Sequence, residues 1–171
     1  MDFIKTQYLF TLLLFIIASA CTEDSGRQDS FDSNEYKEWN TFLGDKASTQ
    51  YSSLQQINRS NVQQLEIAWT FSTGDLIDGI RTEIQANPII VGDILYSTSP
   101  LKKVFALKAD TGELLWMFDP FEGQEPAARG VNRGVAYWSG NGEERILYVA
   151  GARLYSIDAK TGEPDPEFGD N

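Results

Sequence analysis

The sequence predicts an all-β fold that forms part of a β-propeller, and two observations support this. From about residue 62 onward the chain consists of short runs rich in Val, Ile, Leu, Tyr and Trp, separated by Gly, Asp, Asn or Pro. Such runs are typical of β-strands joined by turns, and helical periodicity is poor throughout. This part of the chain also repeats at a period near 50 residues, which is the spacing of a propeller blade of four short strands.

The expected strands follow one another along most of the chain, with turn residues between them. The strands are Ile67–Ser72, Asn87–Val91, Ile94–Thr98, Val104–Lys108, Leu114–Phe118, Gly134–Ser139, Ile146–Ala150 and Arg153–Asp158. The turn signals are Gly92-Asp93, Asp110-Thr111-Gly112, Gly140-Asn141-Gly142 and Lys160-Thr161-Gly162. One short helical turn is expected upstream over Asn58–Leu65, where Asn58 or Ser60 could cap its N-terminus.

Three pairs of matching segments make up the internal repeat. They are Ala106–Glu113 with Ser156–Glu163, Ile94-Leu95-Tyr96 with Ile146-Leu147-Tyr148, and Ala68–Phe71 with Leu115–Phe118. The first pair places Gly112 and Gly162 50 residues apart, and the second recurs after 52 residues. Thr-Gly suits a tight turn, and the Trp that follows it is large enough to pack between blades. A β-sandwich with coincidental Asp-Thr-Gly turns is the alternative.

The length of 171 residues accommodates about two blades, whereas a closed propeller needs roughly four to eight. The sequence also stops at Phe168–Asn171, inside what reads as a loop between strands. We therefore expect an N-terminal fragment of a longer protein.

The composition excludes several kinds of chemistry. The chain has no histidine and one cysteine, so it contains no Ser-His-Asp or Cys-His catalytic set, no histidine metal ligand, no Cys-x-x-Cys-His haem attachment and no internal disulfide. Lys and Arg number 14 against 25 Asp and Glu, for a net charge of −11. That balance argues against nucleic-acid binding, which needs basic surface to neutralise phosphates.

The N-terminus has the features of an export signal. Lys5 precedes the apolar run Leu9–Ala20, which is shorter than the roughly 20 residues of a membrane-spanning helix. The small residues at its end lead directly into Cys21, as in the lipobox of bacterial lipoproteins. We expect a signal peptide over residues 1–20 and lipidation of Cys21, and hence an exported lipoprotein of the cell envelope that faces the periplasm. The alternative is an ordinary Ala-x-Ala signal with an unrelated cysteine.

Residues 21–35 are polar and acidic, so they are expected to form a linker between the lipid and the folded domain. The domain itself is expected over residues 36–171.

Three ordered motifs resemble those of quinoprotein dehydrogenases that depend on pyrroloquinoline quinone (PQQ). Ala106–Trp116 resembles the family's tryptophan-docking repeat, although Lys108 replaces its usual third residue and the second copy lacks the Trp. Tyr51–Asn58, preceded by Trp39, looks like the N-terminal signature, and Asn132–Trp138 resembles the segment Asn-Arg-Gly-x-Ala-Tyr-Trp. The resemblance covers residues 36–171.

The resemblance implies an eight-bladed propeller of the glucose and alcohol dehydrogenase type, with PQQ and calcium near its axis. In such enzymes the metal polarises a quinone carbonyl, an aspartate takes the proton of a substrate hydroxyl, and hydride passes to the cofactor. The substrate would be a sugar, polyol or alcohol, and a quinone or cytochrome would accept the electrons.

The resemblance also implies roles for individual residues. Arg133 matches the arginine that hydrogen-bonds the quinone oxygens, and Gln85 stands where many relatives carry a cofactor-contacting glutamate. An ion pair of Arg133 with a blade carboxylate and a solvent-facing Gln85 are the alternatives. Ala127 and Ala128 replace a vicinal cysteine pair of the alcohol-oxidising branch, which points to sugar or polyol oxidation. The calcium ligands and the catalytic aspartate are expected downstream, so none is assigned here.

Two functions therefore remain open. One is the N-terminal portion of a lipid-anchored, PQQ-dependent dehydrogenase. The other is a non-catalytic propeller lipoprotein that acts as an assembly scaffold in the outer membrane.

Overall fold

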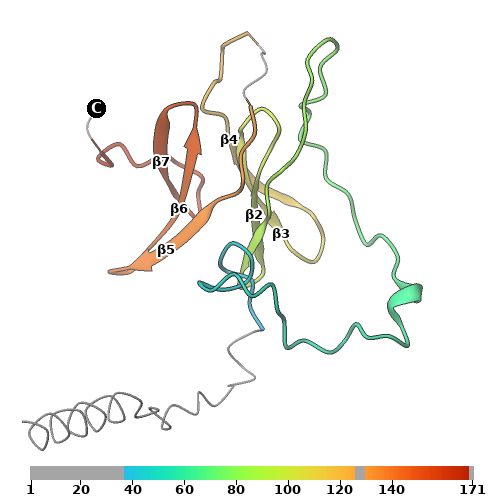
Figure 1. The fold of residues 1–171 in the computed structure, drawn as a ribbon. Helices are drawn as coiled ribbons and strands as arrows, with labels where there is room; N and C mark the ends of the chain where they lie inside the picture. Colours follow the sequence, from blue (N-terminus) through green and yellow to red (C-terminus); the bar gives the residue numbers. More distant parts are fainter. Residues whose placement is uncertain (1–36, 126–129, 170–171) are drawn as a thin grey trace, which may run out of the picture. The chain divides into compact units, whose positions relative to one another are not determined.

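The computed structural model describes residues 37–125 and 130–169, and its strands form two antiparallel sheets (Figure 1). Cys21, the expected signal peptide, and Ala127 and Ala128 lie outside the described residues. In chain order the elements are η1 (Val62–Gln64), β1 (Ile89–Val91), β2 (Ile94–Thr98), β3 (Val104–Lys108), β4 (Leu114–Phe118), β5 (Ala136–Gly140), β6 (Glu143–Ala150) and β7 (Arg153–Asp158).

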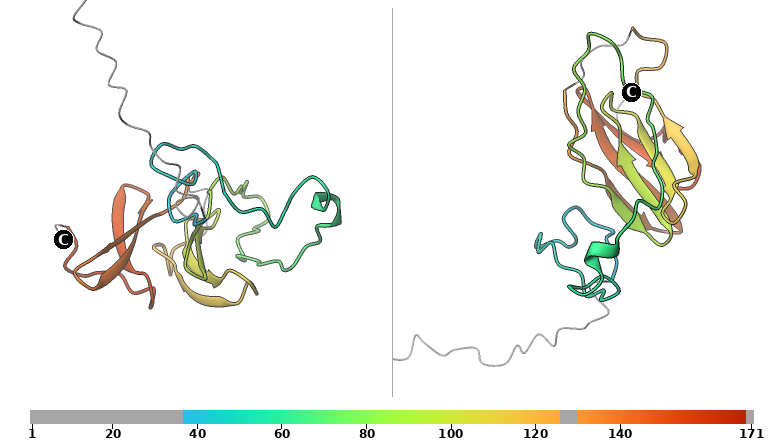
Figure 2. Two further views of the ribbon diagram at one scale, coloured as in Figure 1. Left: turned by 90° about the horizontal axis from the view of Figure 1, so that it is seen from below. Right: turned by 90° about the vertical axis from the view of Figure 1, so that its right-hand side faces the viewer.

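Each sheet is a meander of consecutive strands, as expected for successive propeller blades. The first sheet has the order β1-β2-β3-β4 and the second the order β5-β6-β7. Both belong to the same compact unit of the chain, and Figures 1 and 2 show them side by side. The all-β, partial-propeller prediction is thus confirmed.

The predicted bounds of β2, β3, β4 and β7 are those observed. β1 and β5 each begin two residues later than predicted, at Ile89 and Ala136. β6 begins three residues earlier than predicted, because its ladder with β5 continues to Gly140 opposite Glu143 at the hairpin. The two turn residues between them, Asn141 and Gly142, have φ of 53° and 82°. Positive φ at both positions matches the right-handed twist of the strands and keeps the hairpin tight.

Two further expected elements, both upstream of β1, are absent or shorter than predicted. Ile67–Ser72 is not a strand, because no described segment pairs with it, although its Phe71 ring packs 5.1 Å from that of Phe105 on β3. The helical turn Asn58–Leu65 shrinks to η1, whose N-cap is Asn61 without a side-chain cap bond. The Asn58 side chain bonds Ser60 instead, with Oδ1 accepting from Oγ at 2.6 Å.

The fourth strand of the second sheet is replaced by a single bridge between Ile157 and Pro164. Fifty residues separate Leu114 and Trp116 of β4 from Pro164 and Pro166. Proline has no N–H to donate to a ladder, so this segment does not continue as a regular strand within the described residues.

The repeated triplet Ile-Leu-Tyr is one residue out of structural register. Leu95 pairs with Leu107, but Ile146, not Leu147, pairs with the equivalent residue Ile157. Because side chains alternate between the faces of a sheet, this slip turns Tyr96 and Tyr148 to opposite faces of their own sheets. Both tyrosines therefore enter the core between the two sheets, where they are 3% and 2% exposed.

A tryptophan from one segment of the chain packs on a glycine turn of each sheet. The Trp116 ring from β4 lies over Gly162, and its Nε1 donates to the carbonyl of Ala159 at 2.9 Å. Trp69 repeats this arrangement on the first sheet, since its ring lies over Gly112 and its Nε1 donates to the carbonyl of Ala109 at 3.2 Å. The segment around Trp69 thus contacts the first sheet in the same way that β4 contacts the second sheet.

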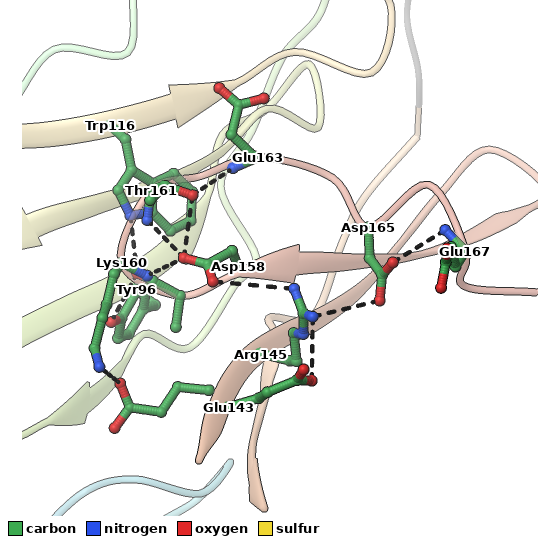
Figure 3. A network of polar contacts seen from close by, with 12 residues as sticks. Tyr96, Trp116, Glu143, Arg145, Asp158, Lys160, Thr161, Glu163, Asp165 and Glu167 are labelled. Carbon is green, nitrogen blue, oxygen red and sulfur yellow. Dashed lines mark hydrogen bonds and ion pairs between the residues drawn. The ribbon is translucent and has the colours of Figure 1, made fainter. Parts of the chain in front are cut away.

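The receiving turn is held rigid by Asp158 (Figure 3). Its Oδ1 accepts from the backbone N–H of Lys160 at 3.0 Å, and from the N–H and hydroxyl of Thr161 at 2.9 and 3.1 Å. Burial opposes ionisation of Asp158, but these hydrogen bonds outweigh it and lower its pKa below the usual value.

We predict that Gly162→Ala lowers the free energy of unfolding by about 2–3 kcal/mol. A Cβ at this position would lie 2.7 Å from the Trp116 ring, and φ is +79°. Gly142→Ala is the matched control, because its φ is +82° and no atom lies within 4 Å of the added Cβ. Gly142→Ala should lower the free energy of unfolding by only about 1 kcal/mol, the cost of positive φ in a residue with a Cβ. Equal losses for the two variants in urea denaturation would contradict a tryptophan contact that requires glycine.

Candidate functional site

The structure brings together the two segments that the sequence singled out. Asn87, which precedes β1, and Gly134, which precedes β5, form a parallel bridge. The backbone N–H of Asn87 donates to the carbonyl of Arg133 at 3.1 Å. Since β1 and β5 are the first strands of their sheets, the entries to the two sheets are joined at this point. We call it the Asn87–Gly134 junction.

The junction needs a glycine at residue 134. A Cβ there would lie 2.8 Å from the carbonyl oxygen of Asn87, and φ is +138°, which L side chains rarely adopt. Asn132 braces the same segment, because its Oδ1 accepts from the N–H of Gly134 and its Nδ2 donates to the carbonyl of Val149, both at 2.7 Å. The backbone on both sides of Arg133 is therefore held in place.

A cavity of about 630 Å³ lies against this segment. Its walls are largely apolar, and its charged lining residues are Lys102 and Arg133. No carboxylate among the described residues lines it. The other lining residues are Phe42, Val131, Asn132, Gly134, Val135, Ala136, Leu147, Tyr148, Val149 and Leu154.

Arg133 forms no ion pair with any acidic residue in the described part of the chain. The alternative that it pairs with a carboxylate on a blade therefore finds no support there.

Gln85 is close to the junction in sequence but does not line the cavity. Its side-chain amide instead donates to the carboxylate of Glu83. Thus the structure brings Arg133 to the cavity but does not bring the Gln85 side chain with it.

A buried ion pair supports the rim of the cavity and was not anticipated from the sequence. Asp75 is 2% exposed and pairs with Lys103 Nζ at 2.7 Å, while its Oδ2 accepts from the N–H of Leu101 at 2.8 Å. Burial opposes ionisation of Asp75, but hydrogen bonds from Lys103, Ser99 and Leu101 outweigh it and lower its pKa. The pair pins the turn between β2 and β3, whose tip carries Lys102.

Phe42, Lys102 and Asp75 have no sequence signal of their own. Each lies in a loop or turn whose proximity to Arg133 is a consequence of the tertiary fold. The adjacent Lys102 and Lys103 offered at most a weak hint, since two neighbouring lysines in a turn are usually solvated.

The described residues contain no cluster of three or more His, Cys, Asp or Glu able to hold a metal ion. They also contain no helix long and apolar enough to cross a membrane.

Residues 39–171 match the family model for the β-propeller domain of glucose/ethanol/alcohol dehydrogenases, designated PQQ. The chain is 40% identical over 127 residues to the lanthanide-dependent methanol dehydrogenase of Methylorubrum extorquens, covering 70% of this chain and 20% of that protein. It is 36% identical over 131 residues to the dehydrogenase subunit of the alcohol dehydrogenase (quinone) of Gluconobacter oxydans, covering 74% and 17%.

Among solved structures, the chain is similar to the quinohemoprotein alcohol dehydrogenase of Comamonas testosteroni, with a TM-score of 0.64 and 32% identity. That match covers 76% of this chain and 19% of the other. The chain thus spans a quarter or less of the length of the curated relatives it matches.

We predict that Gly134→Ala separates the two sheet entries, because the added Cβ would meet backbone rather than a movable side chain. The amide of Asn87 should then exchange with solvent at least about tenfold faster, measured by hydrogen exchange. Gly130→Ala is the control, with φ of +73° and open space around the Cβ. Unchanged exchange at Asn87 in Gly134→Ala would contradict the junction.

Proposed function

The chain belongs to the family of PQQ-dependent glucose/ethanol/alcohol dehydrogenases, matched by residues 39–171, and on that basis we propose that it contributes to an enzyme that oxidises a hydroxyl group with PQQ. One observation carries the proposal: Arg133, held at the Asn87–Gly134 junction, lines an apolar cavity without a described carboxylate to neutralise it.

The cavity suits a planar ring system that bears a quinone and carboxylates. Its volume lies within the range of small-molecule and cofactor sites, and its walls are apolar with a few polar groups, as is usual for such sites. Acidic residues in the lining would repel PQQ, and the described lining has none.

When bound, PQQ supplies the acceptor for the hydride of the substrate's C–H bond. Arg133 would hydrogen-bond a quinone oxygen and stabilise negative charge that develops there. Asn132 and Gly134 would hold the Arg133 backbone so that the guanidinium needs little reorganisation. Apolar residues such as Leu147 and Val149 would exclude water and strengthen this interaction.

The proposal extends to the metal, the substrate and the electron acceptor of the enzyme. We propose calcium as the metal, although the name of the Methylorubrum relative makes a lanthanide the competing choice. The names of the relatives favour an alcohol as substrate, whereas Ala127 and Ala128 favour a sugar or polyol. A quinone acceptor is supported by the name of the Gluconobacter relative, and a cytochrome is the alternative.

The non-catalytic scaffold is less favoured, because Arg133 lines an apolar cavity that has no described carboxylate in its lining, as suits an anionic ligand. We also propose export and lipid anchoring at Cys21, with the domain facing the periplasm. This part rests on the run Leu9–Ala20 followed by the chain's one cysteine.

The full-length protein with PQQ and calcium should reduce an artificial electron acceptor when given an alcohol or sugar. Arg133→Gln should lower kcat/KM by about 100-fold, because one hydrogen bond to the developing charge is lost. Arg59→Gln, an exposed arginine outside the cavity, should leave it unchanged. Absence of both activity and PQQ binding across a broad substrate panel would favour the scaffold.

Cys21→Ser should abolish acylation and release the protein from membranes, since the acyl chains attach to the thiol. Metabolic labelling with a radioactive fatty acid, followed by membrane fractionation, would measure both effects. A Cys21→Ser protein that still needs detergent for extraction would argue against the lipid anchor.

A further inference from the structure

Lys102 is the second cation of the cavity. It forms no side-chain hydrogen bond or ion pair among the described residues. Its neighbour Lys103 is fully engaged with the buried Asp75. Lys102 and Arg133 therefore line one apolar cavity, from different sheets, with no described carboxylate in its lining.

The backbone places Lys102 in an unfavourable conformation. Its φ is +69°, in the left-handed region where glycine and asparagine are favoured. Such positions in a non-glycine residue often coincide with function, and they persist only where the surrounding structure offsets the backbone strain. The Lys102 side chain does not stabilise this turn, since it forms no described hydrogen bond or ion pair with it.

The turn that carries Lys102 is rigid. The N–H of Lys102 donates to the carbonyl of Ser99 at 2.9 Å, and the N–H of Ser99 donates to the carbonyl of Lys103 at 2.8 Å. Asp75 also holds the turn, because it accepts a hydrogen bond from the N–H of Leu101 and forms an ion pair with Lys103. The backbone of Lys102 is thus fixed at the rim, so that only its side chain remains to be ordered when the ammonium binds a ligand.

We propose that Lys102 binds a carboxylate of the cofactor and so positions its ring, while Arg133 hydrogen-bonds a quinone oxygen. This inference rests on the proposed function. PQQ carries carboxylates around a planar ring system, and an ammonium on a flexible stem suits a carboxylate at the edge of such a ring. A charge-assisted hydrogen bond of this kind anchors the ring without taking part in the hydride transfer.

The test measures binding of PQQ to the full-length apoprotein by quenching of tryptophan fluorescence. Lys102→Asn removes the charge but tolerates positive φ, so the turn should persist. It should raise the Kd for PQQ about tenfold and weaken its dependence on salt. Lys102→Arg should restore binding to within about threefold. The control Lys46→Asn makes the same exchange at an exposed lysine outside the cavity and should bind as the wild type does.

The trimethyl ester of PQQ separates the two roles, because it keeps the quinone but lacks the carboxylate charges. Wild type and Lys102→Asn should bind the ester equally well. A wild-type Kd for PQQ in Lys102→Asn would overturn this inference and leave the proposed function intact. A wild-type protein that binds no PQQ would overturn both, and an equal loss of ester and acid binding in Lys102→Asn would show a merely structural role.

Discussion

The contact between a tryptophan ring and a glycine turn sets the spacing on which the remaining structure depends. Trp116 lies against Gly162 so closely that even a Cβ would collide with it. The same contact recurs between Trp69 and Gly112. Because the indole N–H also bonds a fixed carbonyl, each contact sets both the distance and the direction between one unit and the next. With the outer strands set in this way, the first strands of the sheets meet at the Asn87–Gly134 junction.

The cavity is a consequence of that junction and of one buried ion pair. The junction fixes the backbone of Arg133, while Asp75 and Lys103 fix the turn that carries Lys102. Removing one partner of a buried pair leaves an uncompensated charge, which commonly costs about 3–5 kcal/mol. The rim is therefore built from polar groups that bond to one another within the fold, whereas Lys102 and Arg133 form no ion pair among the described residues.

Local sequence signals predicted local structure well and spatial neighbours poorly. β2, β3, β4 and β7 were predicted to the residue, because apolar runs and Thr-Gly turns bound them closely. Ile67–Ser72 has a strand-like composition but no described partner, and a strand needs one. The matching Ile-Leu-Tyr triplets concealed a one-residue slip that only the ladder reveals. Arg133 was found through a motif, whereas Lys102 and Phe42 reach the cavity from distant segments that no linear pattern connects.

We propose that this chain contacts PQQ in the cavity beside the Asn87–Gly134 junction. A crystal structure of the full-length protein grown with PQQ tests it most directly. We expect cofactor density against the apolar wall, with the Arg133 guanidinium within hydrogen-bond distance of a cofactor oxygen. Cofactor bound elsewhere, with Arg133 and the cavity in contact only with solvent or with other protein side chains, would contradict it.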